Sequence, residues 1–473
     1  MLCYNKKLES ENLKSVKERR FFMINDMTKG NPTKVLLLFS APIMLSSIFQ
    51  QFYNMADSVI AGQFISENAL ASVGASFPVT MLFVAIALGF SIGCSVIVSQ
   101  YFGAGRYKDM KTAINTAFVS AITLGVILIL LGVFLCEPIL YMLNTPENII
   151  TDSKTYLDVY IYGILFLMIY NTSTGVFTAL GDSKTPLYFL VASSIGNIGL
   201  DLLFVIQFDM GVAGIAWATF IAQGIASILS FTVVRRKITK FSQDEHIGKV
   251  PVYSNNMFKK IITIAVPSIL QQSFISVGNL LIQGLINGYG SSVVAGYSSA
   301  MKISVFAVMA FSALSSGLSS FTAQNIGAGK IDRVKKGFKS GLIIGISVAT
   351  IFTILFVLFG KEILSLFLDT NSEDAIKTGV SFLVIVALFY PIICVKLIID
   401  AVLRGGGAML AFMIATFTDL VLRVILAFAL SPIFGEIGIW SSWPIGWTVA
   451  SVISVIFYVK GVWENKSKVS TGG

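Results

Sequence analysis

Charged residues are scarce along this chain of 473 residues. Asp, Glu, Lys and Arg together make up 12% of it, about half the share typical of soluble domains, while hydrophobic residues make up 55%. The apolar stretches run for roughly twenty residues or more with few charges, a length that a membrane span requires. A soluble globular fold is therefore excluded, and the composition predicts an all-α polytopic membrane protein.

Histidine and cysteine are almost absent. His246 is the one histidine, and no CxxC spacing joins the four cysteines, which are Cys3, Cys94, Cys136 and Cys394. A zinc site, a disulfide framework and a histidine proton relay are therefore not expected. No set of nucleophile, base and orienting residue is apparent either, so we expect no enzyme and no cofactor beyond a coupling ion.

Apolar runs between turn and charge signals predict twelve membrane helices. Their expected ranges are 34–64, 68–101, 108–135, 150–179, 186–208, 212–234, 257–288, 292–325, 332–359, 376–403, 409–431 and 437–459. Most Lys and Arg residues of this chain, whose net charge is +9, fall in alternate loops, such as Arg106–Lys111, Arg235–Lys240 and Lys330–Lys339. By the positive-inside rule these loops and both termini are cytoplasmic, in a multi-pass protein of the cell membrane. The positive charge then needs no nucleic-acid partner.

The chain also resembles itself at a nearly constant offset. A Gly-Ala-Gly turn follows the second span at 103–105 and the eighth at 327–329, 224 positions later. Six spans return the chain to its starting side, so an axis along the membrane normal should relate the two halves. Further matched pairs are Pro42 with Pro267, Asn54 with Asn279, and 180–182 with 405–407.

This duplication predicts two six-helix lobes, at 34–234 and 257–460. Residues 235–256 would form a cytoplasmic linker, and residues 1–33 and 461–473 cytoplasmic tails. Such a pair of repeats places a substrate cavity between the lobes and makes rocking of one lobe against the other the natural motion. A channel with a single path needs no such pair.

Two carboxyl groups are expected in the outer half of the first lobe. A charged side chain in the hydrocarbon layer costs about 2.5–3.5 kcal/mol on insertion scales, so each one is a candidate for function. At about 1.5 Å per helical residue, Asp57, Asp201 and Thr219 reach similar depths, and Asn197 lies one turn from Asp201. Desolvation and like charge oppose ionisation of both acids, so the pair should hold a proton. Alternatively, the acids share a Na⁺ with oxygens of Asn197 and Thr219, or form an inert, protonated pair.

The second lobe is not expected to contain an acid pair like that of the first lobe. The positions that align with Asp57 are Ile282 and Gln283, neither of them acidic. Charged residues occur elsewhere in this lobe, and either structural pairing or a role in gating or substrate contact would explain them. Lys302, Asp419 and Arg423 fall near mid-membrane and could form an ion-paired set, while Lys396 and Asp400 lie close enough to the cytoplasmic edge to snorkel.

Several segments together resemble the multidrug and toxic compound extrusion (MATE) family, and within it the DinF-like branch. They are 51–62, the two Gly-Ala-Gly turns, 179–186, 197–201 and 403–405, within a similarity that spans about residues 30–460. The resemblance implies two six-helix bundles arranged as a V. It also implies antiport of cationic, amphiphilic compounds against H⁺ or Na⁺.

In the DinF-like branch the resemblance further implies an ion-linked network in the first lobe. The matching positions here are Pro42, Tyr53, Asp57, Asn197, Asp201 and Thr219. The NorM-like branch has carboxylates in the seventh and tenth helices, whereas this sequence has Gln271 and Gln272 in the seventh. A sodium site of that type in the second lobe is therefore not expected.

Other polar residues within the spans are candidates for substrate contact or gating. They are Gln50, Asn54, Gln271, Gln272, Asn279, Gln283, Lys302, Asp419 and Arg423. The leading prediction is a monomeric exporter of small organic cations, working in the lipid bilayer. A flippase for lipid-linked saccharides is an alternative within transporters, and an ion channel or a receptor is an alternative from another class.

Overall fold

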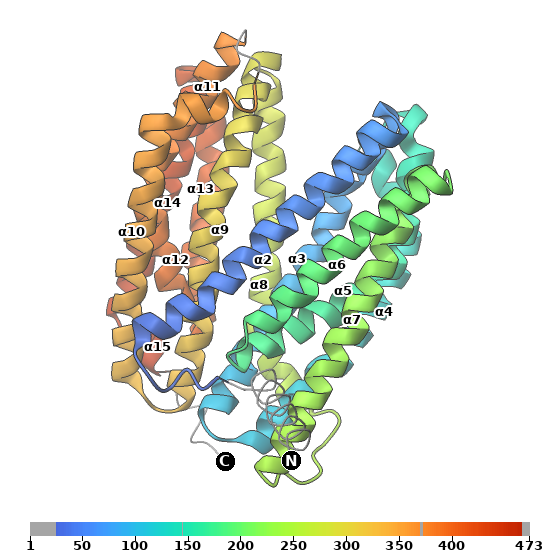
Figure 1. Ribbon diagram of the computed structural model, residues 1–473. Coiled ribbons are helices and arrows are strands. Elements are labelled where there is room, and N and C mark those ends of the chain that lie inside the picture. Colours follow the sequence, from blue (N-terminus) through green and yellow to red (C-terminus); the bar gives the residue numbers. More distant parts are fainter. Residues whose placement is uncertain (1–24, 144, 369–371, 466–473) are drawn as a thin grey trace, which may run out of the picture.

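The computed structural model describes residues 25–143, 145–368 and 372–465, and these residues fold into long helices (Figure 1). The helices are α2 (Pro32–Ile60), α3 (Glu67–Gly103), α4 (Tyr107–Met142), α5 (Glu147–Ala179), α6 (Lys184–Leu202), α7 (Gly211–Asp244), α8 (Asn255–Asn287), α9 (Ser291–Gly327), α10 (Ile331–Leu364), α11 (Glu373–Ala387), α12 (Tyr390–Gly405), α13 (Met409–Phe434), α14 (Glu436–Val459) and the short α15 (Val462–Asn465). Two π-helical segments, η1 (Ala61–Ile65) and η2 (Leu203–Gln207), extend α2 and α6. Most of the predicted tails at 1–33 and 461–473 lies outside the described residues.

Eleven helices of the described chain are long and apolar enough to span a membrane, and α11 with α12 forms a twelfth, bent span. The bend between these two helices is 50°. Pro391 lies in the first turn of α12, where its missing N–H leaves no helical hydrogen bond unmade. The prediction of an all-α membrane protein with twelve spans is confirmed, but the helix expected over 376–403 is a broken pair.

Local sequence signals explain where several helices begin. Asn31 accepts hydrogen bonds from the backbone N–H groups of Thr33 and Lys34, and Pro32 takes the first position of α2. Ser66 caps α3 in the same way. The sixth span continues to Asp244, beyond the predicted end at 234, so the connection to α8 is shorter than expected.

The helices form two six-helix bundles that diverge as a V from one end of the molecule (Figure 1). We call this end the base; α2 begins there and α14 ends there (Figure 1). The first lobe contains α2 to α7 and the second contains α8 to α14. Helix α2 runs diagonally, contacting α9 and α10 of the second lobe as well as α6 of its own lobe. It therefore runs from the base of the second lobe to the half of the first lobe that lies far from the base.

The two Gly-Ala-Gly repeats meet at the base, across the boundary between the lobes. A Cβ atom added to Gly103 would lie 1.9 Å from the carbonyl oxygen of Gln324, and one added to Gly327 would lie 2.0 Å from that of Gln100. Each repeat thus packs its glycine against the backbone of the other, an approach that a larger residue would prevent.

The glutamines of the repeats add a second, nearly symmetric pair of contacts. Gln100 Nε2 donates to the carbonyl of Gly405 at 3.0 Å, and Gln324 Nε2 donates to that of Ala179 at 2.7 Å. Gly405 belongs to the third pair of repeated segments, and Ala179 directly precedes its counterpart at 180–182. The internal repeat of the sequence is therefore also the contact that joins the lobes at the base.

Candidate functional site

Asp57, Asn197 and Asp201 are buried where three helices of the first lobe meet. Their exposed fractions are 9%, 1% and 0%. Asp57 comes from α2, Asn197 and Asp201 from α6, and the neighbouring Thr219 from α7. In the amide orientation that satisfies its neighbours, Asn197 Nδ2 donates to Asp201 Oδ2 at 3.0 Å and to Asp57 Oδ1 at 3.1 Å, while its oxygen accepts from the backbone N–H of Thr219 at 3.1 Å. One amide side chain thus joins all three helices.

The same amide nitrogen lies within 3.1 Å of one oxygen of each acid, so the carboxyl groups of Asp57 and Asp201 are held close together. Burial and like charge oppose ionisation of both groups at such a separation, so the pair favours holding one proton. The other oxygen of the second acid, Asp201 Oδ1, is buried and has no hydrogen-bond partner among the described residues. The arrangement can therefore hold a proton and release it, and it leaves one acceptor position open.

Tyrosine side chains enclose the acid pair. The hydroxyl of Tyr53, one turn before Asp57 on α2, lies 3.3 Å from Thr219 Oγ1. Tyr156 and Tyr160 of α5 stack with ring centroids 6.3 Å apart, and Tyr156 packs into a buried apolar cluster beside the site. Sequence reasoning did not name Tyr156 and Tyr160, although two tyrosines four positions apart on one span indicate a common face. They limit the access of water to the carboxyl groups.

A π-helical segment follows each acid within about one turn. η1 begins shortly after Asp57 and η2 shortly after Asp201, and the two segments contact each other. Such segments are rare and occur frequently at functional sites. They were not predicted, because most residues of both segments are ordinary helix or strand formers.

Pro42 does not join the acid cluster. It lies in the base half of α2, about 22 Å from Asp57 along the helix at 1.5 Å per residue. Proline cannot donate the backbone hydrogen bond of its turn, yet α2 remains helical through it. The predicted network thus divides into five residues that meet around Asn197 and one that is placed to affect bending of α2.

Lys396 and Asp400 of α12 are buried, contrary to the prediction from the sequence. They were expected to snorkel to the cytoplasmic edge, but their exposed fractions are only 2% each and they form an ion pair at 2.9 Å. Ser454 Oγ of α14 donates to Asp400 at 2.9 Å, and the hydroxyl of Thr416 lies between the two charges. Neighbouring helices therefore compensate the charges inside the lobe.

The expected ion-paired set of Lys302, Asp419 and Arg423 is likewise not formed in the described part of the chain. Asp419 and Arg423 are both buried in α13, but no ion pair joins them. The guanidinium of Arg423 instead lies 4.3 Å from the ring centre of Trp443, a cation–π contact. Lys302 is exposed on α9 and separate from both. The sequence alone does not show that an aromatic ring stabilises the charge of Arg423, because Trp443 lies on another helix.

The remaining polar candidates lie along α2 and α8. Gln50 and Asn54 are exposed, while Gln271, Gln272, Asn279 and Gln283 are partly buried. Side-chain oxygens of Gln271 and Asn279 have no hydrogen-bond partner among the described residues. These residues stay candidates for substrate contact. Ile282, which aligns with Asp57, is fully buried among apolar residues, in line with a second lobe that lacks this acid.

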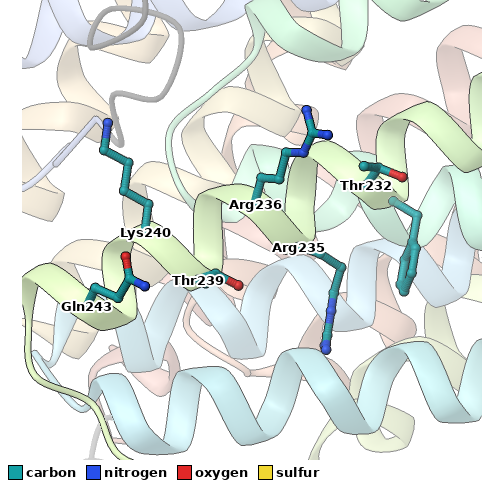
Figure 2. Close-up of a pocket in the computed structure, with 7 residues that line it drawn as sticks. Thr232, Arg235, Arg236, Thr239, Lys240 and Gln243 are labelled. Atoms are coloured by element: carbon teal, nitrogen blue, oxygen red, sulfur yellow. The ribbon is translucent and has the colours of Figure 1, made fainter.

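A shallow surface pocket of about 560 Å³ lies elsewhere, beside the base end of α7 (Figure 2). Its lining includes Phe231, Thr232, Arg235, Arg236, Thr239, Lys240 and Gln243. Figure 2 shows Arg235 and Arg236 pointing away from α7 in different directions. Arg235 Nη1 donates to Asn115 Oδ1 at 3.1 Å, which ties α7 to α4. This basic surface lies at the end of the helix and does not include the acid pair.

The fold and the buried acid site together define a polytopic α-helical transporter with duplicated lobes. A family model described as MatE matches residues 42–203 and again 267–429. The chain therefore belongs to the MatE family, and the two matched segments coincide with the two halves of the internal repeat. The DinF-like branch stays a prediction.

Relatives and solved structures agree with this assignment. The chain is 32% identical to the probable multidrug resistance protein YpnP of Bacillus subtilis, over 93% of this chain and 97% of that protein. It is 25% identical to the probable multidrug resistance protein NorM of Thermotoga maritima, over 92% and 94% of the two chains. A crystal structure of a MATE protein in a bent conformation superposes with a TM-score of 0.83 at 21% identity, covering 94% of this chain and 98% of that one. A mutant form of the Vibrio cholerae MATE transporter VcmN gives a TM-score of 0.83 at 20% identity, over 91% and 97% of the chains.

Proposed function

We propose that this protein is a secondary active antiporter that exports cationic, amphiphilic organic compounds in exchange for protons. The observation that carries the proposal is that one buried amide, that of Asn197, joins the carboxyl groups of Asp57 and Asp201. A membrane protein that needed only stability would gain more from an apolar pair, because a buried acid is costly within the bilayer. Names of relatives such as YpnP support multidrug compounds as the substrates.

The geometry favours H⁺ over Na⁺ as the coupling ion. In the orientation that satisfies its neighbours, the Asn197 amide donates to both carboxyl groups, which supports a proton-holding pair. Na⁺ at Asp57, Asn197, Asp201 and Thr219 would require the amide to turn so that its oxygen joins the carboxylate oxygens.

Proton binding would act on transport through α2. This helix carries Asp57 in its far half and contacts the second lobe in its base half. A change in the Asp57–Asp201 contact therefore alters how α2 packs on α6, and Pro42 lies in the part of α2 between the two lobes. Bending of α2 would couple the proton to drug release and then to rocking of the lobes 34–234 and 257–460.

The proposed orientation places the base in the cytoplasm of the cell. The basic segments Arg106–Lys111 and Lys330–Lys339, which begin α4 and α10, lie at the base, as does the basic end of α7 (Figures 1 and 2). Positive residues mark the cytoplasmic side of a membrane protein. Both termini are then cytoplasmic, and the V opens away from the cytoplasm. We further propose that the transporter works as a monomer, since each chain contains both lobes.

The proposal is tested by efflux of a small panel of organic cations from proteoliposomes, with pH and sodium gradients imposed separately. Efflux driven by the pH gradient is expected, and Asp57→Asn or Asp201→Asn should reduce it by roughly tenfold or more. Asp158→Asn is a matched control, because Asp158 belongs to the same lobe but not to the acid cluster. Undiminished proton-driven efflux in both cluster variants would refute the coupling site, and efflux driven by sodium alone would refute the choice of ion.

A further inference from the structure

Residues 25–30, which we call the strap, cross the base before α2 begins. Met27 and Thr28 of the strap are only 2% and 8% exposed. At one end, Asn25 contacts the first lobe: its backbone N–H donates to the carbonyl of Leu180 at 3.1 Å and its Nδ2 to that of Gly181 at 3.1 Å. A Cβ atom on Gly181, whose φ is +73°, would lie 2.1 Å from the carbonyl oxygen of Asn25. The first lobe thus has a seat that fits this segment closely.

The rest of the strap is held by two cations of the second lobe. Lys330 Nζ donates to the carbonyl and the hydroxyl of Thr28 at 2.9 and 3.1 Å. Arg333 donates to the carbonyl of Gly30 at 2.6 Å and to that of Met27 at 3.1 Å. Charge-assisted hydrogen bonds of this kind are stronger than neutral ones, so the strap is fastened to the start of α10.

Gln324 joins the strap and both lobes through one side chain. Its Oε1 accepts from the backbone N–H of Met27 at 2.9 Å, and its Nε2 donates to the carbonyl of Ala179 in the first lobe at 2.7 Å. Gln324 is fully buried, so loss of either contact would leave a buried polar group of its side chain without a partner. Separation of the lobes at the base must break the bond to Ala179 and the bonds of Asn25 together.

We propose that the strap is a latch for the base-closed state and that Gln324 is its positioning residue. The strap leads directly into α2, so a movement of the strap also moves the start of the helix that carries Asp57. Closing the base seats Asn25 on Leu180 and Gly181, and opening the base releases it. This inference rests on the alternating-access function proposed above, but it concerns the balance of conformations and not the ion that drives them.

The test measures the width of the base directly, without transport. Spin labels are placed at Lys108 in the first lobe and Lys339 in the second, which are both exposed, and their distance distribution is recorded by pulsed electron resonance in lipid nanodiscs. Arg333→Gln, Lys330→Gln and the double variant should increase the wide-base population, by roughly tenfold for the double variant given the strength of charged hydrogen bonds. Arg333→Lys should restore part of the narrow population, because it keeps the charge.

Lys336→Gln is the matched control, since Lys336 is an exposed lysine on the same turn of α10 that makes no strap contact. Gln324→Met, of similar shape, should widen the base without any change in charge. An unchanged distance distribution in a correctly folded double variant would overturn the latch, as would an equal change in the Lys336→Gln control. Because the readout uses resting protein, loss of coupling through Asp57 would not imitate either result.

Discussion

Asp57 and Asp201 come from different helices, yet their carboxyl groups share one donor, the amide nitrogen of Asn197, at 3.1 and 3.0 Å. The amide is in turn held by the backbone of Thr219 on a third helix. The protonation state of the pair is therefore linked to the relative positions of α2, α6 and α7. A coupling ion that binds to the acid pair or leaves it therefore changes how these three helices pack on one another.

The hydroxyl of Thr219 provides the first prediction. It lies 3.3 Å from the hydroxyl of Tyr53 and 3.4 Å from the amide of Asn197. Thr219→Val, which keeps the shape but removes the hydroxyl, should lower proton-driven efflux by roughly tenfold, because the tyrosine and the amide lose a shared partner. Thr219→Ser should retain most of the activity. Equal activity of the two variants in the same proteoliposome assay would show that the hydroxyl has no part in coupling.

The rise per helical residue was sufficient to predict that Asp57, Asp201 and Thr219 lie at one depth in the first lobe. The structure brings these three residues together around Asn197. The rise per residue could not predict the tyrosine layer of α5, since rotation of that helix about its axis is set by packing. The π-helical segments after each acid also escaped prediction. They depend on how α2 and α6 end against each other, which is a tertiary property.

The buried pair of Lys396 and Asp400 predicts that single variants lose more thermal stability than the double variant does. Lys396→Met or Asp400→Leu alone leaves one charge without its partner inside the lobe and should destabilise it by about 3–5 kcal/mol. The double variant should recover most of the lost thermal stability, because no uncompensated charge remains. The measurement is the unfolding temperature in detergent micelles. A double variant no more stable than either single variant would argue that Thr416 and Ser454 carry the network instead.

The crossing of the glycine repeats predicts a strict size limit at the base. Gly103→Ala would place a methyl group 1.9 Å from the carbonyl oxygen of Gln324, so the lobes must separate by more than a small adjustment. We expect this variant to favour the wide-base state in the spin-label experiment and to reduce efflux severalfold. Gly74→Ala, on the same helix but with no atom within 4 Å of the added methyl group, is the control and should behave like the unaltered protein.

The repeat itself was evident from the sequence, but its structural purpose was not. The Gly-Ala-Gly motifs predict turns, and Gly105 and Gly329 do adopt positive φ values of +68° and +69°. The packing of Gly103 against Gln324 and of Gly327 against Gln100 could not be predicted, because a local motif contains no information on what approaches it. The same limit applies to the charged residues of the second lobe. Their partners, such as Trp443 and Ser454, belong to helices remote in sequence.

The strap contains an acid whose titration should weaken the latch. Burial raises the pKa of Asp26, but hydrogen bonds from Thr28 and Lys29 outweigh it and leave the pKa below its ordinary value. A carboxyl with a lowered pKa in the folded state stabilises that state above its unfolded value of about 3.9, and the contribution disappears as the pH falls through the lowered value. Asp26→Asn should therefore widen the base at pH 7, and its difference from the unaltered protein should shrink only as the pH falls through the lowered pKa. Distance distributions recorded over a series of falling pH values check this, with Asp332→Asn as the control for an exposed acid of the same region. A difference between Asp26→Asn and the unaltered protein that stayed the same across the whole series would exclude ionisation of Asp26 as its cause.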